Sequence, residues 1–157
     1  MMGPLLVFAV DERAFALPLE RVERAVRAVA ITPLPQAPAI VCGVINIAGR
    51  IVPVVDLRRR FSLPERAIEA IKLADQLLIT HGGRRPLALI VDTVSGVVAC
   101  AEHDFVAADS IVAGTAYLHG IAKSPSGMVL IHDLDTLLSL DEAQALDSAL
   151  TPAGEMA

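Results

Sequence analysis

The sequence predicts a mainly β protein, and three observations support this prediction. Short apolar runs rich in Val, Ile and Leu recur along the chain, and pairs of them flank brief polar or glycine-containing segments, as in β-hairpins. Stretches with helical periodicity are few and short. Hydrophobic residues make up 54% of the 157 residues and charged residues 20%, which excludes intrinsic disorder and favours one domain of two packed halves over residues 1–157.

Four hairpins are predicted in chain order. Their strand pairs are 5–10 with 14–18, 43–48 with 51–55, 76–80 with 87–91, and 117–123 with 128–132. In the second hairpin, Gly49 is suited to the positive φ that a short turn needs. Between the first two hairpins, Leu19, Val22, Val26 and Val29 have helical spacing, but the segment is rich in valine. We therefore predict a helical turn over 19–21 followed by a strand.

A few short helices complete the prediction. Asp56 is placed to cap a turn over 57–61, and Asp133 to cap 134–140. Residues 141–150 have helical spacing, so 141–157 are expected to form a helical or frayed C-terminal tail. The polar segment 62–73 is expected to be an exposed connector between the two halves.

Charge and composition exclude several partners. The chain has 13 Lys and Arg against 18 Asp and Glu, a net charge of −5, and it has no Trp and a single Tyr. Nucleic acid is therefore not an expected partner, because duplex binding needs a basic face and base stacking needs aromatic rings. Direct membrane insertion is also excluded, because the longest uncharged stretch, 28–49, contains three prolines and two glycines.

No motif for catalysis, metal or cofactor binding is recognised. The four histidines lack metal-ligand spacing, and neither a nucleophile elbow nor a glycine-rich phosphate loop occurs. Asp56 and Asp92 are interpreted as a helix cap and a strand-end residue, and the arginines at 58–60 as a solvated face. Cys42 and Cys100 lie in apolar surroundings and are expected to be free buried thiols, as in a cytoplasmic protein. The sequence thus predicts a protein that is not an enzyme.

Several blocks resemble the CheW family of chemotaxis adaptors. They are LPLERV at 17–22, ITPLP at 31–35, GVINIAGRIVPVVDLR at 43–58, IVDTVSGVV at 90–98, LHGIAK at 118–123, and the segment 128–138. The resemblance extends over about residues 5–140. It implies two intertwined, five-stranded, SH3-like β-barrels, in a cytoplasmic adaptor that links chemoreceptor signalling tips to the regulatory domain of a CheA-type histidine kinase in membrane-bound receptor arrays.

The resemblance also implies a set of functional positions. The receptor groove between the barrels maps to Leu6, Leu19, Val22, Ala25 and Val97. Each of these has plain core packing as its alternative. Three further motif residues are interpreted as fold-defining turn and bulge residues rather than as contacts, namely Asn46, Gly49 and Pro53.

The chain departs from the family pattern at two positions. Ala48 replaces a common arginine, and Ala30 replaces a common acidic residue before ITP. Impaired receptor–kinase coupling is therefore one expectation. The alternatives are an adaptor of a specialised pathway such as type IV pilus control, a decoy that binds only the kinase, and a small-molecule-binding β-barrel.

Overall fold

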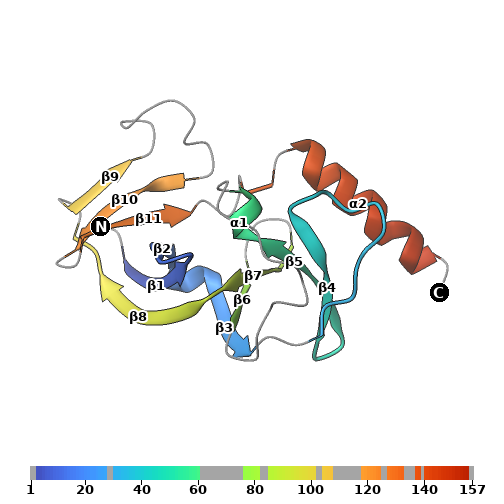
Figure 1. Cartoon of the computed structure of the whole chain (residues 1–157), viewed down its shortest axis with the longest axis horizontal. Coiled ribbons are helices and arrows are strands. Elements are labelled where there is room, and N and C mark those ends of the chain that lie inside the picture. The colour runs from blue at the N-terminus through green and yellow to red at the C-terminus, as the bar shows by residue number, and fades with distance from the viewer. Residues whose placement is uncertain are drawn as a thin grey trace.

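Two β-sheets form the fold, and the chain passes from one to the other twice. The computed structural model describes residues 3–27, 30–60, 76–81, 85–101, 104–107, 118–124, 127–132, 137–138 and 140–155. One sheet has the strand order β8-β1-β2-β11-β10-β9 and the other β3-β6-β7-β5-β4 (Figure 1). The strands are β1 (Pro4–Val10), β2 (Arg13–Pro18), β3 (Val22–Arg27), β4 (Val41–Ile47), β5 (Arg50–Asp56), β6 (Gln76–Thr80), β7 (Leu87–Val91), β8 (Thr93–Ala99), β9 (Phe105–Ala107), β10 (Leu118–Ser124) and β11 (Gly127–His132).

The two crossings interleave the halves. The first lies at the 3-10 turn η1 (Leu19–Arg21), between β2 and β3, and the second at Asp92, between β7 and β8. The described strands thus confirm the predicted mainly β fold with intertwined halves. The first sheet has six strands where the resemblance implied five, because the three-residue β9 pairs with β10.

The predicted hairpins are present. β1 with β2, β4 with β5, β6 with β7, and β10 with β11 form antiparallel pairs. The β1–β2 turn has positive φ at Asp11 (53°) and Glu12 (64°), and the β4–β5 turn at Ala48 (51°) and Gly49 (87°). Two successive positive φ values give the twist that a two-residue hairpin needs, so Gly49 has the predicted conformation and Ala48 shares it.

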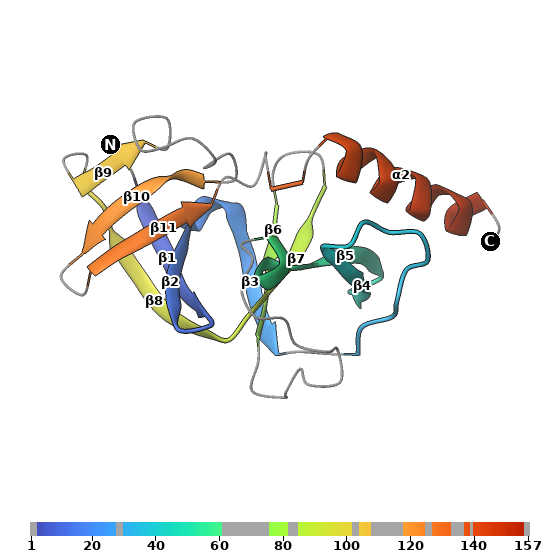
Figure 2. The ribbon, with the colours of Figure 1, turned by 45° about the horizontal axis from the view of Figure 1, so that its top comes forward.

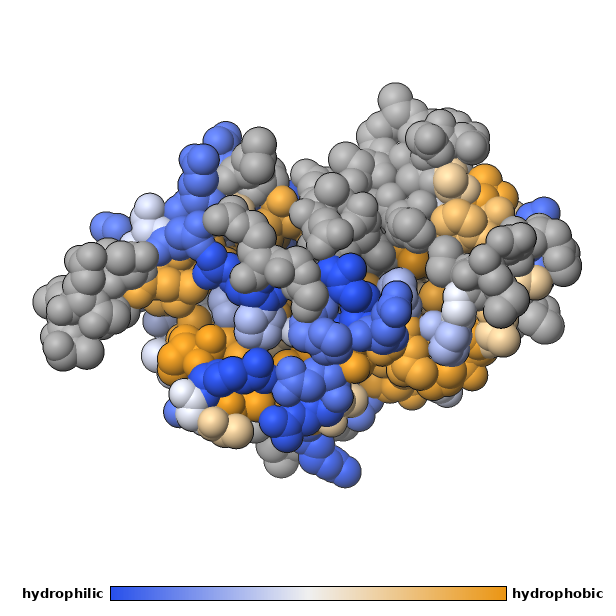
Figure 3. Space-filling view, turned by 180° about the vertical axis from the view of Figure 1, so that it is seen from behind, coloured by the Kyte–Doolittle hydropathy of each residue, from blue (hydrophilic) through white to orange (hydrophobic). Residues whose placement is uncertain are grey.

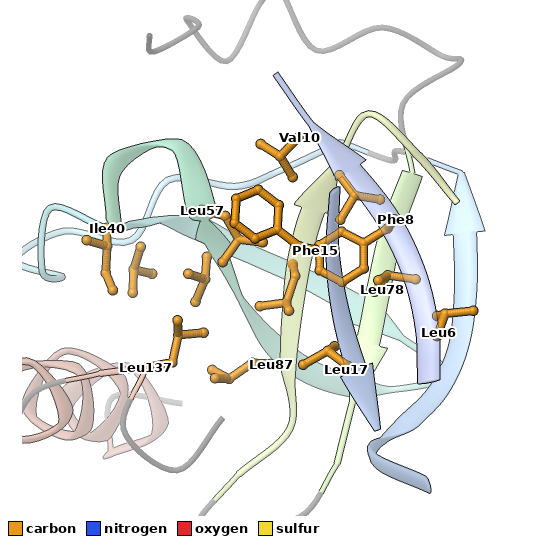
Figure 4. Packing of buried hydrophobic residues seen from close by; sticks show 14 of the residues in the cluster. Leu6, Phe8, Val10, Phe15, Leu17, Ile40, Leu57, Leu78, Leu87 and Leu137 are labelled. Carbon is orange, nitrogen blue, oxygen red and sulfur yellow. The ribbon is translucent and has the colours of Figure 1, made fainter. Parts of the chain in front are cut away.

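The core has one cluster shared by both sheets and one smaller cluster for each sheet. The shared cluster contains Phe8 and Phe15 from the first sheet, with ring centroids 6.1 Å apart, together with Leu78 and Leu89 from the second and Leu57, which directly follows β5 (Figure 4). All five are at most 1% exposed. Burial of this set accounts for the joining of the two halves, since apolar contact is the main favourable contribution to folding.

The predicted turn after Asp56 and the C-terminal helix are present, but the predicted 134–140 helix is wrong at Leu137 and Leu138, which form a bend with Leu137 fully buried in the shared core. In α1 (Leu57–Arg60), Asp56 Oδ1 accepts a hydrogen bond of 3.0 Å from the Arg58 backbone N–H, as a cap should. α2 (Leu140–Glu155) lies at the end of the molecule that carries β4 and β5 (Figures 1 and 2). Its Leu146 is fully buried in the shared core. The predicted cap at Asp133 and the 62–73 connector lie outside the described residues.

The interpretation of 58–60 as a solvated face is wrong. The side chains of Arg58 and Arg60 are only 10% and 9% exposed. Arg58 donates through Nη2 to both carboxylate oxygens of Asp92, at 3.1 and 3.0 Å, and its Nη1 lies 3.5 Å from Asp11 Oδ1. Arg60 binds Glu142 of α2. Arg58 therefore lies at the junction of the two sheets and Arg60 beneath α2, and in both places carboxylates compensate the buried charge.

We expect Arg58→Ala to lower the free energy of unfolding by about 3 kcal/mol, because it leaves the Asp92 and Asp11 carboxylates without their shared cation at the junction. Urea unfolding followed by circular dichroism measures this change. Arg13→Ala, at an exposed position of the β1–β2 hairpin, is the control and should change stability by less than about 0.5 kcal/mol. Equal midpoints for the two variants would contradict a structural role of the Arg58 contacts.

Candidate functional site

β3 contains a bulge that decides which of its side chains face the shared core. Val22 pairs with Thr80 and Arg24 with Ile79, so Glu23 is the extra residue. Directly opposed residues of an antiparallel pair lie on the same face of the sheet. After the bulge, Ala25 pairs with Leu78. Val22 and Ala25, three residues apart, therefore lie on one face with Leu78 of the shared core.

β8 has the same device. Val97 pairs with Leu6 and Val94 with Phe8, which makes Ser95 the extra residue. Val94 and Val97 therefore share the face of Leu6 and Phe8, both members of the shared core. The neighbouring Val98 pairs with Leu5 and lies on the other face.

These faces meet in one apolar area, which we call the inter-sheet strip. Leu6 is 8% exposed, and Leu19, Val22 and Val94 pack partly buried against the same cluster. Figure 4 shows Leu6 at the edge of that cluster, beside the ribbon of β3, and Figures 1 and 2 both place the first part of β8 next to β3. The strip comprises Leu6, Leu19, Val22, Ala25, Val94 and Val97.

The strip contains both core and surface positions. Leu6 is core, in line with the alternative considered for it. Ala25 is exposed, and Val97 is 53% exposed. All five positions taken from the resemblance thus lie on the faces of β1, β3 and β8 that are directed toward the shared core, or pack against that core from η1. Sequence reasoning missed Val94, because its spacing of three from Val97 fits strand alternation only once the bulge at Ser95 is known.

A polar contact links the two sheets beside the strip. Gln76 of β6 accepts a hydrogen bond of 3.0 Å through its side-chain oxygen from the backbone N–H of Val94. At the other end of β3, the Arg21 and His81 backbones pair at 2.9 Å, and Arg21 Nε donates to His81 O at 3.0 Å. The first contact joins the start of β8 to the start of β6, and the second joins the residue before β3 to the residue after β6.

Charged groups border the strip on the outer side of β3. Arg50 Nη2 lies 2.9 and 3.0 Å from the two carboxylate oxygens of Glu23, which closes the β4–β5 hairpin against β3. Arg24 lies 4.0 Å from Glu23 and is about half exposed. From behind, hydrophilic side chains occupy the middle of the molecule between two hydrophobic areas (Figure 3).

The motif positions have structural explanations. Asn46 accepts a 2.8 Å hydrogen bond through Oδ1 from the Gly49 backbone N–H, across the turn that contains Ala48. Pro53 is not at a bulge: it precedes Val54, where pairing with β7 begins, so its missing N–H costs no hydrogen bond to β7. The bulge of this hairpin lies between Val41 and Gly43. A Cβ at Gly43 would lie 2.3 Å from Thr32 O, so only glycine fits.

The reactive groups that the structure describes do not form a catalytic site. Cys42 and Cys100 are free and buried, as predicted. Burial raises the pKa of the Cys42 thiol to about 11, with a smaller contribution from the Asp56 carboxylate, and burial also raises the pKa of Cys100. Both thiols therefore stay protonated at neutral pH and are poor nucleophiles. Within the described ranges, His, Cys, Asp and Glu side chains form no cluster of three that could bind a metal, and no helix is long and apolar enough to cross a membrane.

Comparison with known proteins agrees with this architecture. The chain is 27% identical over 148 residues to the chemotaxis protein CheW of Treponema pallidum, covering 90% of this chain and 85% of the relative. It is 28% identical over 136 residues to that of Thermotoga maritima, covering 85% and 86%. The crystal structure of the scaffolding protein TtCheW from Thermoanaerobacter tengcongensis superposes with a TM-score of 0.80 at 29% identity, covering 90% of this chain and 96% of that one.

The family assignment follows from the extent of these matches. The profile of the CheW-like domain matches residues 4–142, which includes both crossings between the sheets and every residue of the inter-sheet strip. The match supports the expectation of a non-catalytic scaffold, in line with the description of TtCheW as a scaffolding protein. This chain belongs to the CheW-like domain family.

Proposed function

We propose that this protein is a cytoplasmic scaffold that couples chemoreceptor signalling tips to the regulatory domain of a CheA-type histidine kinase within membrane-bound receptor arrays. The relatives that match most of its length are chemotaxis CheW proteins, one of them described as a scaffolding protein. The observation that supports the proposal is the inter-sheet strip, an apolar area beside the shared core that includes the five positions proposed for receptor binding.

An apolar strip suits a protein partner. Exposed Ala25 and Val97 lie beside partly buried Val22 and Val94, so a partner would cover apolar surface that is already supported by the core. Interfaces gain most of their affinity from such central apolar contacts, whereas their polar rims contribute less.

We expect the purified protein to bind the isolated regulatory domain of its CheA-type kinase. Isothermal titration calorimetry and co-elution at tens of micromolar detect the affinities that are typical of transient signalling interfaces. The absence of heat and of co-elution at these concentrations would count against the kinase half of the proposal.

We expect Val97→Asp to weaken binding of a receptor-tip fragment more than tenfold, because a carboxylate in the strip would lose its hydration without gaining a partner, at a cost of about 2 kcal/mol. Val98→Asp is the matched control, since Val98 is 42% exposed on the same strand but faces the other side. Binding is measured by fluorescence anisotropy, and circular dichroism checks that both variants fold.

Equal loss in the Val97 and Val98 variants, or no loss in either, would place receptor binding elsewhere. Both positions are preferred to Val22 for this test. Val22 packs partly buried against the shared core, so a charge there would lower stability as well as affinity.

We expect Ala48→Arg to raise receptor control of kinase activity in reconstituted arrays, and Ala48→Arg with Ala30→Glu to raise it further. Both alanines are exposed, and Ala48 already has a φ of 51°, so a longer side chain adds no new backbone strain. Arginine would add a multi-donor cation beside the Arg50–Glu23 pair. Ala48→Met is the control of similar length, and identical activity of the Arg and Met variants would show that charge at this turn has no effect.

A further inference from the structure

Arg27 ends the inter-sheet strip with a positive charge. It is the last residue of β3 and pairs with Gln76, two positions along β6 from the partner of Ala25. By the alternation of the strand, its side chain lies on the same face as Ala25 and Val22. Gln76 also accepts the hydrogen bond from Val94 of β8. Arg27 therefore lies where both walls of the strip come together.

The charge of Arg27 is not neutralised within the described part of the chain. Arg27 is exposed and forms no ion pair there. The nearby carboxylate of Glu23 is engaged by both Arg50 and Arg24. η1, β3 and the first residue of β5 together contain four arginines and two glutamates. Their summed charge is +2, whereas the net charge of the protein is −5. These residues are Arg21, Arg24, Arg27 and Arg50, with Glu20 and Glu23.

The arrangement indicates the chemistry of the bound segment. A guanidinium at the end of an apolar contact gains most from a carboxylate, which it can bind through two parallel hydrogen bonds. A ligand that was apolar along its whole length would instead remove water from Arg27 without replacing its hydrogen bonds. The basic surroundings also attract an acidic partner before contact, which raises the association rate at low salt.

We propose that Arg27 is a specificity-determining residue of the receptor-binding surface, and that it binds a carboxylate of the receptor tip next to the apolar segment that covers Val22, Ala25 and Val97. This inference rests on the proposed function, because it takes the receptor tip as the occupant of the strip. The inference requires an acidic residue in the receptor tip and identifies Arg27 as the residue that binds it.

Arg24 provides the matched control on the same strand. It pairs with Ile79, so the bulge and the strand alternation place it on the face away from the strip. Its side chain is 49% exposed, and its Nη2 comes no closer than 4.0 Å to Glu23 Oε1. A general attraction between the basic strand and an acidic receptor would involve Arg24 and Arg27 alike, whereas direct contact would involve Arg27 alone.

The test measures binding of a labelled receptor-tip fragment to the full-length protein by fluorescence anisotropy at low and high salt. We expect Arg27→Glu to weaken binding about tenfold or more at low salt and Arg24→Glu to weaken it less than about twofold. Arg27→Gln should lose a smaller factor and show a flatter salt dependence than the wild type. Replacing one receptor carboxylate at a time with lysine should identify a variant that restores binding to Arg27→Glu.

The outcomes separate this inference from the proposed function. If the wild type does not bind the receptor tip, the receptor half of the proposed function is wrong. If the wild type binds and Arg27→Glu binds equally well, or loses no more than Arg24→Glu, the function stands and the role of Arg27 is wrong. Loss of binding to the kinase regulatory domain in Arg27→Glu would assign this surface to the kinase and would also overturn the inference.

Discussion

The salt-bridge cluster of Arg58, Asp92 and Asp11 is the contact on which the geometry of this protein depends. Asp92 lies where the chain leaves the second sheet for the first, and its backbone N–H donates to Ala9 O of β1 at 2.8 Å. The Asp11 backbone N–H donates to Asp92 Oδ2 at 2.8 Å. One guanidinium thus connects α1, the β1–β2 turn and the crossing into β8. Because the Arg58 side chain is mostly buried, the cluster tolerates few alternative arrangements, and it fixes β8 against β1 before any partner is present.

The inter-sheet strip depends on this fixed crossing and on two bulges. Without the extra residue in β3, Val22 and Ala25 would lie on opposite faces, and the same holds for Val94 and Val97 in β8. Each bulge thus converts a spacing of three into a single apolar face. The bulge in β3 also explains why Val22 and Ala25 have helical spacing in a strand. Val26 does not belong to this face, because it packs against the smaller core cluster of the second sheet.

The sequence alone predicts the strands, the hairpin turns and the helical turn at Leu19, because valine-rich runs and the polar or glycine-containing segments between them are local signals. It also predicts the cap at Asp56. It does not predict the buried state of Arg58 and Arg60, because their compensating carboxylates come from β1–β2, the second crossing and α2, far along the chain. The positions of Val94 and Arg27 in the strip are not predicted for a related reason. The face on which each side chain lies depends on the inter-strand register, which a single sequence does not specify at a bulge.

β3 and β8, the two strands that flank the inter-sheet strip, differ in the charge of their edges, and this difference is relevant to partner binding. β3 and β8 are both edge strands. β3 carries Glu23, Arg24 and Arg27, charges that oppose pairing with another strand, whereas β8 has no charged residue and exposes Val97 and Val98. In β8 only the bulge at Ser95 and the neighbouring Gly96, with a φ of 141°, interrupt regular pairing. An uncharged, apolar edge is a liability unless a partner covers it. An apolar edge in β8 opposite the basic strand β3 is the combination that an apolar partner with a carboxylate requires.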